Sequence, residues 1–147
     1  MKDGHKRSIA KGASWRLIGT LDTILLSLIF TGAIDKALKI GAIELFTKIL
    51  LYYIHERIWE RLSFGTKEKL IDGKLKRREL HARSVAKGIS WRIVGSLDTF
   101  WIALFVNHDS PHAVQTAFYI TATEVFTKIF FFWAHERAWM RVRWGRN

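Results

Sequence analysis

Four long apolar segments alternate with polar stretches along the chain. They cover residues 17–34, 40–59, 93–106 and 114–133. A helix needs about 20 apolar residues to cross a hydrocarbon layer of ~30 Å. The third segment is shorter than this and must be extended by residues on either side. The pattern predicts four transmembrane helices, with hairpin turns near residues 33–35 and Pro111.

The chain also contains an internal duplication. SIAKGASWRLIGTLDT, residues 8–23, returns as SVAKGISWRIVGSLDT, residues 84–99, with eleven identities in sixteen positions. ELFTKILLYYIHERIW, residues 44–59, returns as EVFTKIFFFWAHERAW, residues 124–139, with nine. Each copy therefore holds two crossings, and both copies enter the membrane in the same direction. Such parallel repeats are expected to be related by a pseudo-twofold axis along the membrane normal.

The predicted fold is an all-α integral membrane four-helix bundle built from two tandem parallel αα-hairpin repeats. The first hairpin is expected in residues 1–62 and the second in residues 84–147. A basic connector, residues 63–83, joins them. We expect this connector to be a short link followed by a basic helical lead-in to the third crossing.

Charge separates from apolar sequence along the chain. The net charge is +11 although 49% of the residues are hydrophobic, and most basic residues gather near the two termini and in the connector. The positive-inside rule then predicts a multi-pass protein of the cell (inner) membrane with both termini cytoplasmic. The expected partners are the lipid bilayer and anionic headgroups, with a homo-oligomer left open. No nucleic acid is expected, because no aromatic–basic interleaving accompanies the charge.

Six charged side chains fall inside the predicted helices, close to mid-depth. They are Asp22, Glu44, Lys48, Asp98, Glu124 and Lys128. Each ionised group facing lipid would cost on the order of 3 kcal/mol, so the six are expected to meet as an intramembrane polar cluster. Lys48 is expected to pair with Asp22 and Glu44. Lys128 is expected to pair with Asp98 and Glu124.

The cluster has more carboxylates than ammonium groups. Each repeat carries two carboxylates and one ammonium, so one negative charge per repeat needs a neutralising partner. A proton, a bound cation or a basic group from another subunit would serve. A satisfied polar core that only specifies packing is an equally open interpretation.

A second polar set lies where the helices leave the membrane. It comprises Arg16, His55, Glu56, Arg57, Arg92, His135, Glu136 and Arg137. We expect an interfacial network, with Arg16 meeting lipid phosphate or Glu56. A bis-imidazole haem or metal site at His55 and His135 is the alternative. The HERIW sequence lacks the second histidine of a zinc-protease helix, and neither a metal nor another cofactor is predicted.

The repeated motifs SWRxxGxxDT and ExFTKxxxxxxHERxW resemble a family of small, mainly prokaryotic membrane proteins catalogued as a domain of unknown function. Two tandem copies cover nearly the whole chain. The resemblance implies a membrane hairpin and supplies no activity. If single-hairpin members dimerise, this chain is similar to a covalently fused dimer.

Two functions of different class are compatible with these patterns. The first is a small ion- or proton-linked channel or transporter that uses the intramembrane polar cluster. The second is a non-catalytic membrane scaffold or partner subunit with a basic cytoplasmic face. An enzyme is not expected, since the sequence has no Gly-rich phosphate loop, nucleophile elbow or Ser/His/Asp arrangement.

Overall fold

The computed structural model describes residues 5–71, 74–142 and 144, and most of these lie in four long helices. The helices are α1 (His5–Thr31), α2 (Ile34–Arg61), α3 (His81–Val106) and α4 (Ala113–Arg141). The four predicted helices and both turn positions are confirmed. Gly32, between α1 and α2, has a φ of 67°, a conformation that glycine adopts without strain. Residues 1–4 and 145–147, predicted to be cytoplasmic, lie outside the described part.

The connector differs from its prediction. It forms two antiparallel strands, β1 (Thr66–Ile71) and β2 (Lys74–Glu79), where a short link was expected, and the helix that leads into the third apolar segment begins only at His81. The sequence between the strands, Asp-Gly at 72–73, is a strong hairpin signal that the basic composition obscured. Leu80 N–H donates to the Gly65 carbonyl at 2.9 Å and brings the hairpin back to the start of α3.

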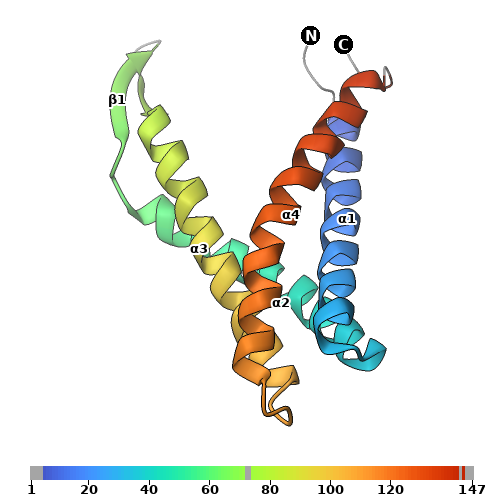
Figure 1. Ribbon diagram of the computed structural model, residues 1–147. Helices are drawn as coiled ribbons and strands as arrows, with labels where there is room; N and C mark the ends of the chain where they lie inside the picture. The colour runs from blue at the N-terminus through green and yellow to red at the C-terminus, as the bar shows by residue number, and fades with distance from the viewer. Residues whose placement is uncertain (1–4, 72–73, 143, 145–147) are drawn as a thin grey trace.

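The four helices form two diverging arms (Figure 1). Within each repeat, α1 packs against α2 and α3 packs against α4. Between repeats, α1 also packs against α4 and α2 against α3, so each arm at the open end combines helices from different repeats. Both termini lie at the open end of one arm, and β1 lies at the open end of the other. The helices of the two repeats therefore cross near their middle.

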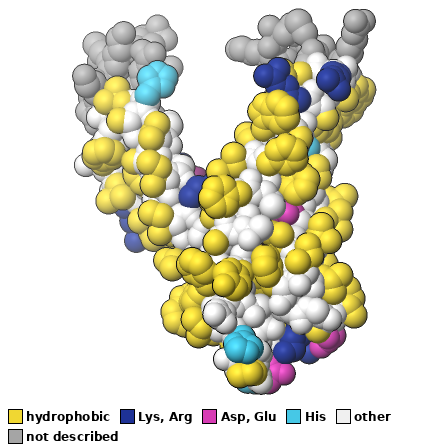
Figure 2. All heavy atoms as spheres, viewed as in Figure 1, with side chains coloured by type: hydrophobic (Ala, Val, Ile, Leu, Met, Phe, Trp, Pro, Cys, Tyr) yellow, Lys and Arg dark blue, Asp and Glu magenta, His cyan; other side chains and the backbone are white. Residues whose placement is uncertain are grey.

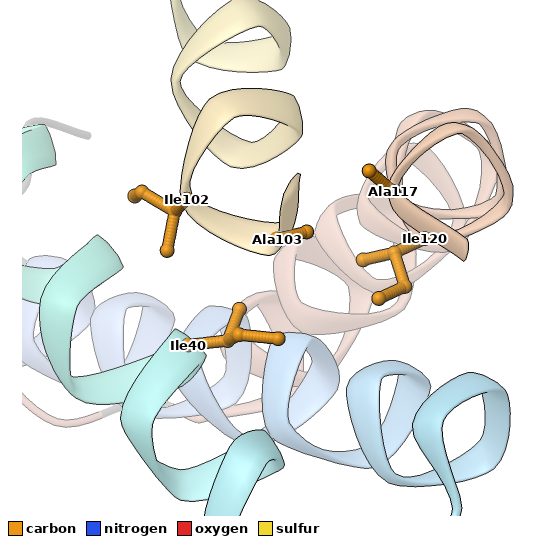
Figure 3. Packing of buried hydrophobic residues seen from close by; sticks show 5 residues of the cluster. All are labelled: Ile40, Ile102, Ala103, Ala117 and Ile120. Atoms are coloured by element: carbon orange, nitrogen blue, oxygen red, sulfur yellow. The ribbon is translucent and has the colours of Figure 1, made fainter. Parts of the chain in front are cut away.

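A small apolar core lies beyond the crossing, toward the turns. Figure 3 shows Ile40 of α2 close to Ile102 and Ala103 of α3 and to Ala117 and Ile120 of α4. Small side chains allow the helices to approach elsewhere, since the side chains of Thr23, Ser27 and Thr99 are fully buried. Such a core is too small to hide the apolar residues of four long helices.

Much of the apolar surface therefore faces outward (Figure 2). On α1, Leu17, Leu21, Leu25 and Ile29 recur every fourth residue, and each is more than half exposed. Continuous apolar stripes of this kind mark a surface that contacts lipid or a partner. By length and composition, Ile9–Thr31 and His81–Val106 are each able to cross a membrane.

One ion pair joins the turn ends of the two repeats. Lys36 Nζ donates to Asp109 Oδ1 at 2.6 Å, and this hydrogen bond holds the pKa of Asp109 below its usual range. The pair should stabilise the fold above the unfolded-state pKa of Asp109 and lose that contribution as the pH falls through the folded-state pKa. We expect NMR titration of Asp109 to give a depressed midpoint that Lys36→Met moves upward. An unchanged midpoint in the variant would rule out the pair.

Candidate functional site

The polar cluster forms where the helices cross, and the first half of it joins α2 to α3. Lys48 Nζ donates to the Gly95 carbonyl at 2.6 Å and to Thr99 Oγ1 at 2.9 Å, and it lies 3.3 Å from Asp98 Oδ2. Thr47 Oγ1 donates to the same carboxylate at 2.9 Å. The Thr-Lys pair of the first repeat thus binds the Asp-Thr pair of the second.

The second half joins α4 to α1 in a corresponding way. Thr127 Oγ1 donates to Asp22 Oδ2 at 2.8 Å, and Lys128 Nζ donates to Thr23 Oγ1 at 3.2 Å. Thr23 in turn donates to Glu124 Oε1 at 2.8 Å. The Thr-Lys pair of the second repeat therefore binds the Asp-Thr pair of the first.

Glu44 links the two halves. Its Oε1 lies 3.2 Å from Lys48 Nζ and 3.0 Å from Lys128 Nζ, while its buried Oε2 has no hydrogen-bond partner among the described residues. Lys128 also forms an ion pair with Glu124, so one ammonium group bridges the glutamates of both repeats. All these carboxylates are nearly inaccessible, as interactions in a low-dielectric interior require.

The cluster confirms part of the expected pairing and corrects the rest. Each lysine does contact the glutamate one turn before it on its own helix. The predicted pairing of Lys48 with Asp22, and of Lys128 with Asp98, is wrong. Near the crossing, α2 faces α3, which brings Asp98 to Lys48, and Asp22 is held by Thr127 of α4. The six predicted residues meet, but across the repeats.

A cleft of about 390 Å³ opens from this cluster between the two arms (Figure 2). Each helix contributes four lining residues, and the two sets of eight occupy equivalent repeat positions. The lining consists of Trp15, Arg16, Gly19, Thr20, Glu44, Leu45, Lys48 and Tyr52, together with Trp91, Arg92, Gly95, Ser96, Glu124, Val125, Lys128 and Phe132. A site to which all four helices contribute equally follows directly from the duplication.

The cleft has a charged floor and an apolar seal. Glu44 and Glu124 lie at its end, and Ile40 and Ile120 lie one helical turn further toward the hairpin turns, both fully buried. The apolar core in Figure 3 therefore lies between the charged residues and the turn end of the molecule. The cleft is open toward the end that carries the termini and the connector.

Arg16 and Arg92 are two further basic residues beside the cluster. Both line the cleft, and two guanidinium groups with two lysines match the four carboxylates of the cluster. The expected contact between Arg16 and Glu56 is not formed, because Glu56 binds Lys87 at 2.7 Å.

The two histidines have separate structural partners in separate arms. His55 Nε2 lies 2.8 Å from Ser90 Oγ and accepts from Trp59 Nε1 at 3.1 Å. His135 Nε2 makes the same contacts with Ser14 at 2.8 Å and Trp139 at 3.0 Å. Within the described ranges, no group of three or more histidine, aspartate or glutamate side chains is placed to hold a metal ion.

The rest of the predicted interfacial set divides into separate contacts. Glu136 pairs with Lys11 at 2.7 Å, in the same way that Glu56 pairs with Lys87. Arg57 lies over the Tyr53 ring at 5.2 Å, and Arg137 lies over the Trp133 ring at 5.7 Å. A single continuous network of histidine, glutamate and arginine is therefore the wrong description.

Two buried arginines bind the C-terminal ends of α2 and α4, and this role was not predicted. Arg83 donates to the carbonyl oxygens of Trp59, Leu62 and Phe64, which lie in the last turn of α2 and just beyond it. Arg7 repeats these contacts on Trp139, Val142 and Trp144. A cation at a helix C-terminus satisfies the last carbonyl groups and complements the helix dipole. The sequence did contain a signal for this role. An arginine stands immediately before each of the repeated segments 8–23 and 84–99, as Arg7 and as Arg83.

A family model described as "Predicted membrane protein (DUF2061)" matches residues 9–60 and 85–140. The chain belongs to this family. The two matched segments correspond to two tandem copies of the DUF2061 hairpin, and the family assignment supports a membrane location. No curated protein and no solved structure matches the chain. The DUF2061 segments include the Asp-Thr and Thr-Lys pairs that bind across the repeats.

Proposed function

We propose that this protein is a small ion- or proton-linked membrane transporter without enzymatic activity. In this proposal the chain crosses the inner membrane four times and keeps both termini and the connector in the cytoplasm. The cleft then opens toward the cytoplasm, and the charged cluster lies near mid-depth. The positive-inside distribution of basic residues supports this orientation.

The observation that carries the proposal is the position of the charged groups. Lys48, Lys128, Glu44 and Glu124 border a cleft instead of being enclosed in packed core. Charged residues inside a membrane are costly and commonly mark the path of a transported species. A cluster needed only for packing has no reason to adjoin an open space lined by all four helices.

The one-sided cleft favours a carrier over a channel. Ile40 and Ile120 lie fully buried beyond the floor, so ions have no continuous polar path to the turn end. The reciprocal contacts of the two repeats support a pseudo-twofold axis through the cluster. Movement of the two arms about this axis would open the seal and close the cleft, as alternating access requires.

Flux through proteoliposomes tests this proposal. Native protein should dissipate at least one imposed gradient among protons, monovalent cations and anions, as measured with entrapped dyes. Asp22→Asn combined with Asp98→Asn should slow that flux about tenfold, because a barrier increase of only ~1.4 kcal/mol has this effect. Neutralising Asp98 removes a carboxylate that lies 3.3 Å from Lys48 Nζ, and neutralising Asp22 removes the equivalent carboxylate of the first repeat.

A matched variant keeps this test specific. Asp35→Asn with Asp109→Asn removes the same number of carboxylates at the turn end and should preserve flux. Circular dichroism must show that both variants retain the native helix content. Silence of the native protein under every gradient would exclude transport and favour the alternative, a membrane scaffold with a basic cytoplasmic face.

A further inference from the structure

We propose that the cleft binds an anion, held by Arg16, Arg92, Lys48 and Lys128. The inference deepens the proposed function and rests on it, because it names the charge class of the transported species. It comes from how the charged groups are turned relative to the cleft. The total charge of the cluster does not show this feature.

The positive groups of the cleft lining outnumber the negative groups and are more exposed. Asp22 and Asp98 do not line the cleft, so its lining has four basic side chains against two acidic ones. The side chains of Lys48 and Lys128 retain 16% and 17% exposure, whereas those of Glu44 and Glu124 retain 5% and 6%. The accessible charge at the floor is therefore mainly that of the ammonium groups.

The two arginines strengthen this asymmetry. Arg16 and Arg92 are exposed, and neither forms an ion pair or hydrogen bond with any residue in the described part of the chain. A guanidinium group presents a planar set of donors that fits the oxygens of phosphate or carboxylate. Arg16 and Arg92 therefore have donors available to an anion, and Lys48 and Lys128 place further positive charge at the floor of the same recess.

The shape of the cleft provides space for a ligand beside these groups. A side chain at Gly19 would meet nothing within 4 Å, so the wall is open at this position. Trp15 and Trp91 border the same space with their aromatic rings. The recess is thus suited to a small inorganic or organic anion, either free in solution or as the headgroup of an anionic lipid.

Quenching of tryptophan fluorescence tests the inference on the full chain in a non-ionic detergent. Trp15 and Trp91 lie in the cleft, and comparison with Trp15→Phe/Trp91→Phe isolates their signal. At constant ionic strength, iodide should quench this signal more steeply than caesium, and inorganic phosphate should compete with iodide. Arg16→Gln/Arg92→Gln should weaken phosphate binding about tenfold, since each charge-assisted hydrogen bond contributes at least a comparable factor.

Two controls make the result specific. Arg16→Lys/Arg92→Lys should retain most of the phosphate affinity, because it keeps both charges. Arg57→Gln/Arg137→Gln should have no effect, since these arginines stack on Tyr53 and Trp133 outside the cleft. Equal quenching by caesium, or unchanged phosphate affinity in the Arg16/Arg92 variant, would overturn the inference.

Nanodiscs distinguish the two sources of the anion. Protection from iodide in phosphatidylglycerol discs but not in phosphatidylcholine discs would identify a lipid headgroup, and phosphate competition in both would identify a free anion. The experiments also distinguish failure of this inference from failure of the proposed function. Proton or cation flux without anion binding would remove only this inference, whereas anion binding without flux would remove only transport.

Discussion

Replacement of Lys48 by Met should destabilise the protein by about 3–5 kcal/mol, the usual cost of removing one partner from a buried ion pair. The substitution would leave the Asp98 carboxylate with Thr47 and no adjacent ammonium group. Adding Asp98→Asn should recover much of the loss, because the unpaired charge is removed. The free energy of unfolding, measured by titration with a denaturing detergent, gives both values.

The pairing of Lys48 with Asp98, a residue of the other repeat, can be tested directly. In a double-mutant cycle, Lys48→Met should couple strongly to Asp98→Asn and weakly to Asp22→Asn. Lys39→Met removes an exposed lysine from the same helix and should change stability by less than about 0.5 kcal/mol. Stronger coupling of Lys48 to Asp22 would contradict the pairing with Asp98 and support a pairing within one hairpin.

Sequence periodicity located the cluster because depth and facing direction are local properties of a helix. Asp22 lies level with residues 44–48 when the first turn is known, and burial cost requires these charged groups to meet. The choice of partner is different. Since residues 124–128 duplicate residues 44–48, Asp22 matches both sets equally well, and the pattern contains no information that separates them. Only the crossing of the helices decides in favour of α4.

The threonines beside the charges were overlooked for a related reason. A threonine such as Thr23 or Thr127 is small enough to fit between closely packed helices, and the side chain of Thr23 is fully buried. Their hydroxyl groups also donate to Glu124 and Asp22. A hydroxyl satisfies a buried carboxylate without adding charge, which explains why a threonine accompanies the aspartate and the lysine in both repeats.

The connector shows how composition misled the local prediction. Its basic residues indicated a cytoplasmic helix, yet neither charge nor helix propensity decided the backbone conformation. Gly65 has a φ of 66°, and a β-carbon at this position would lie 2.7 Å from Cβ of Arg83. The chain therefore turns sharply at the end of α2 and passes close to Arg83. This contact joins residues 18 positions apart, beyond the range of a periodicity argument.

Replacement of Arg83 by Ala should be the most damaging single change at the open end of the molecule. Arg83 is 2% exposed, donates to three backbone carbonyl groups and lies over the Trp59 ring at 5.4 Å. Charge-assisted hydrogen bonds contribute about 1.5–3 kcal/mol each to stability, and the carbonyl groups left without a donor would remain poorly solvated. We expect a loss of about 3–5 kcal/mol in the free energy of unfolding, measured in mixed micelles.

The duplication supplies the comparison that separates this role from a general effect of charge. Arg7→Ala should cost a similar amount, because Arg7 makes the same three kinds of contact at the end of α4. Arg83→Lys should recover only part of the stability, since an ammonium group cannot reproduce the planar arrangement of guanidinium donors. Arg57→Ala, at an exposed site on α2, should leave the unfolding transition unchanged. If Arg83→Ala behaves like Arg57→Ala, the arms do not depend on these caps, and the remaining contacts between the helices hold the open end.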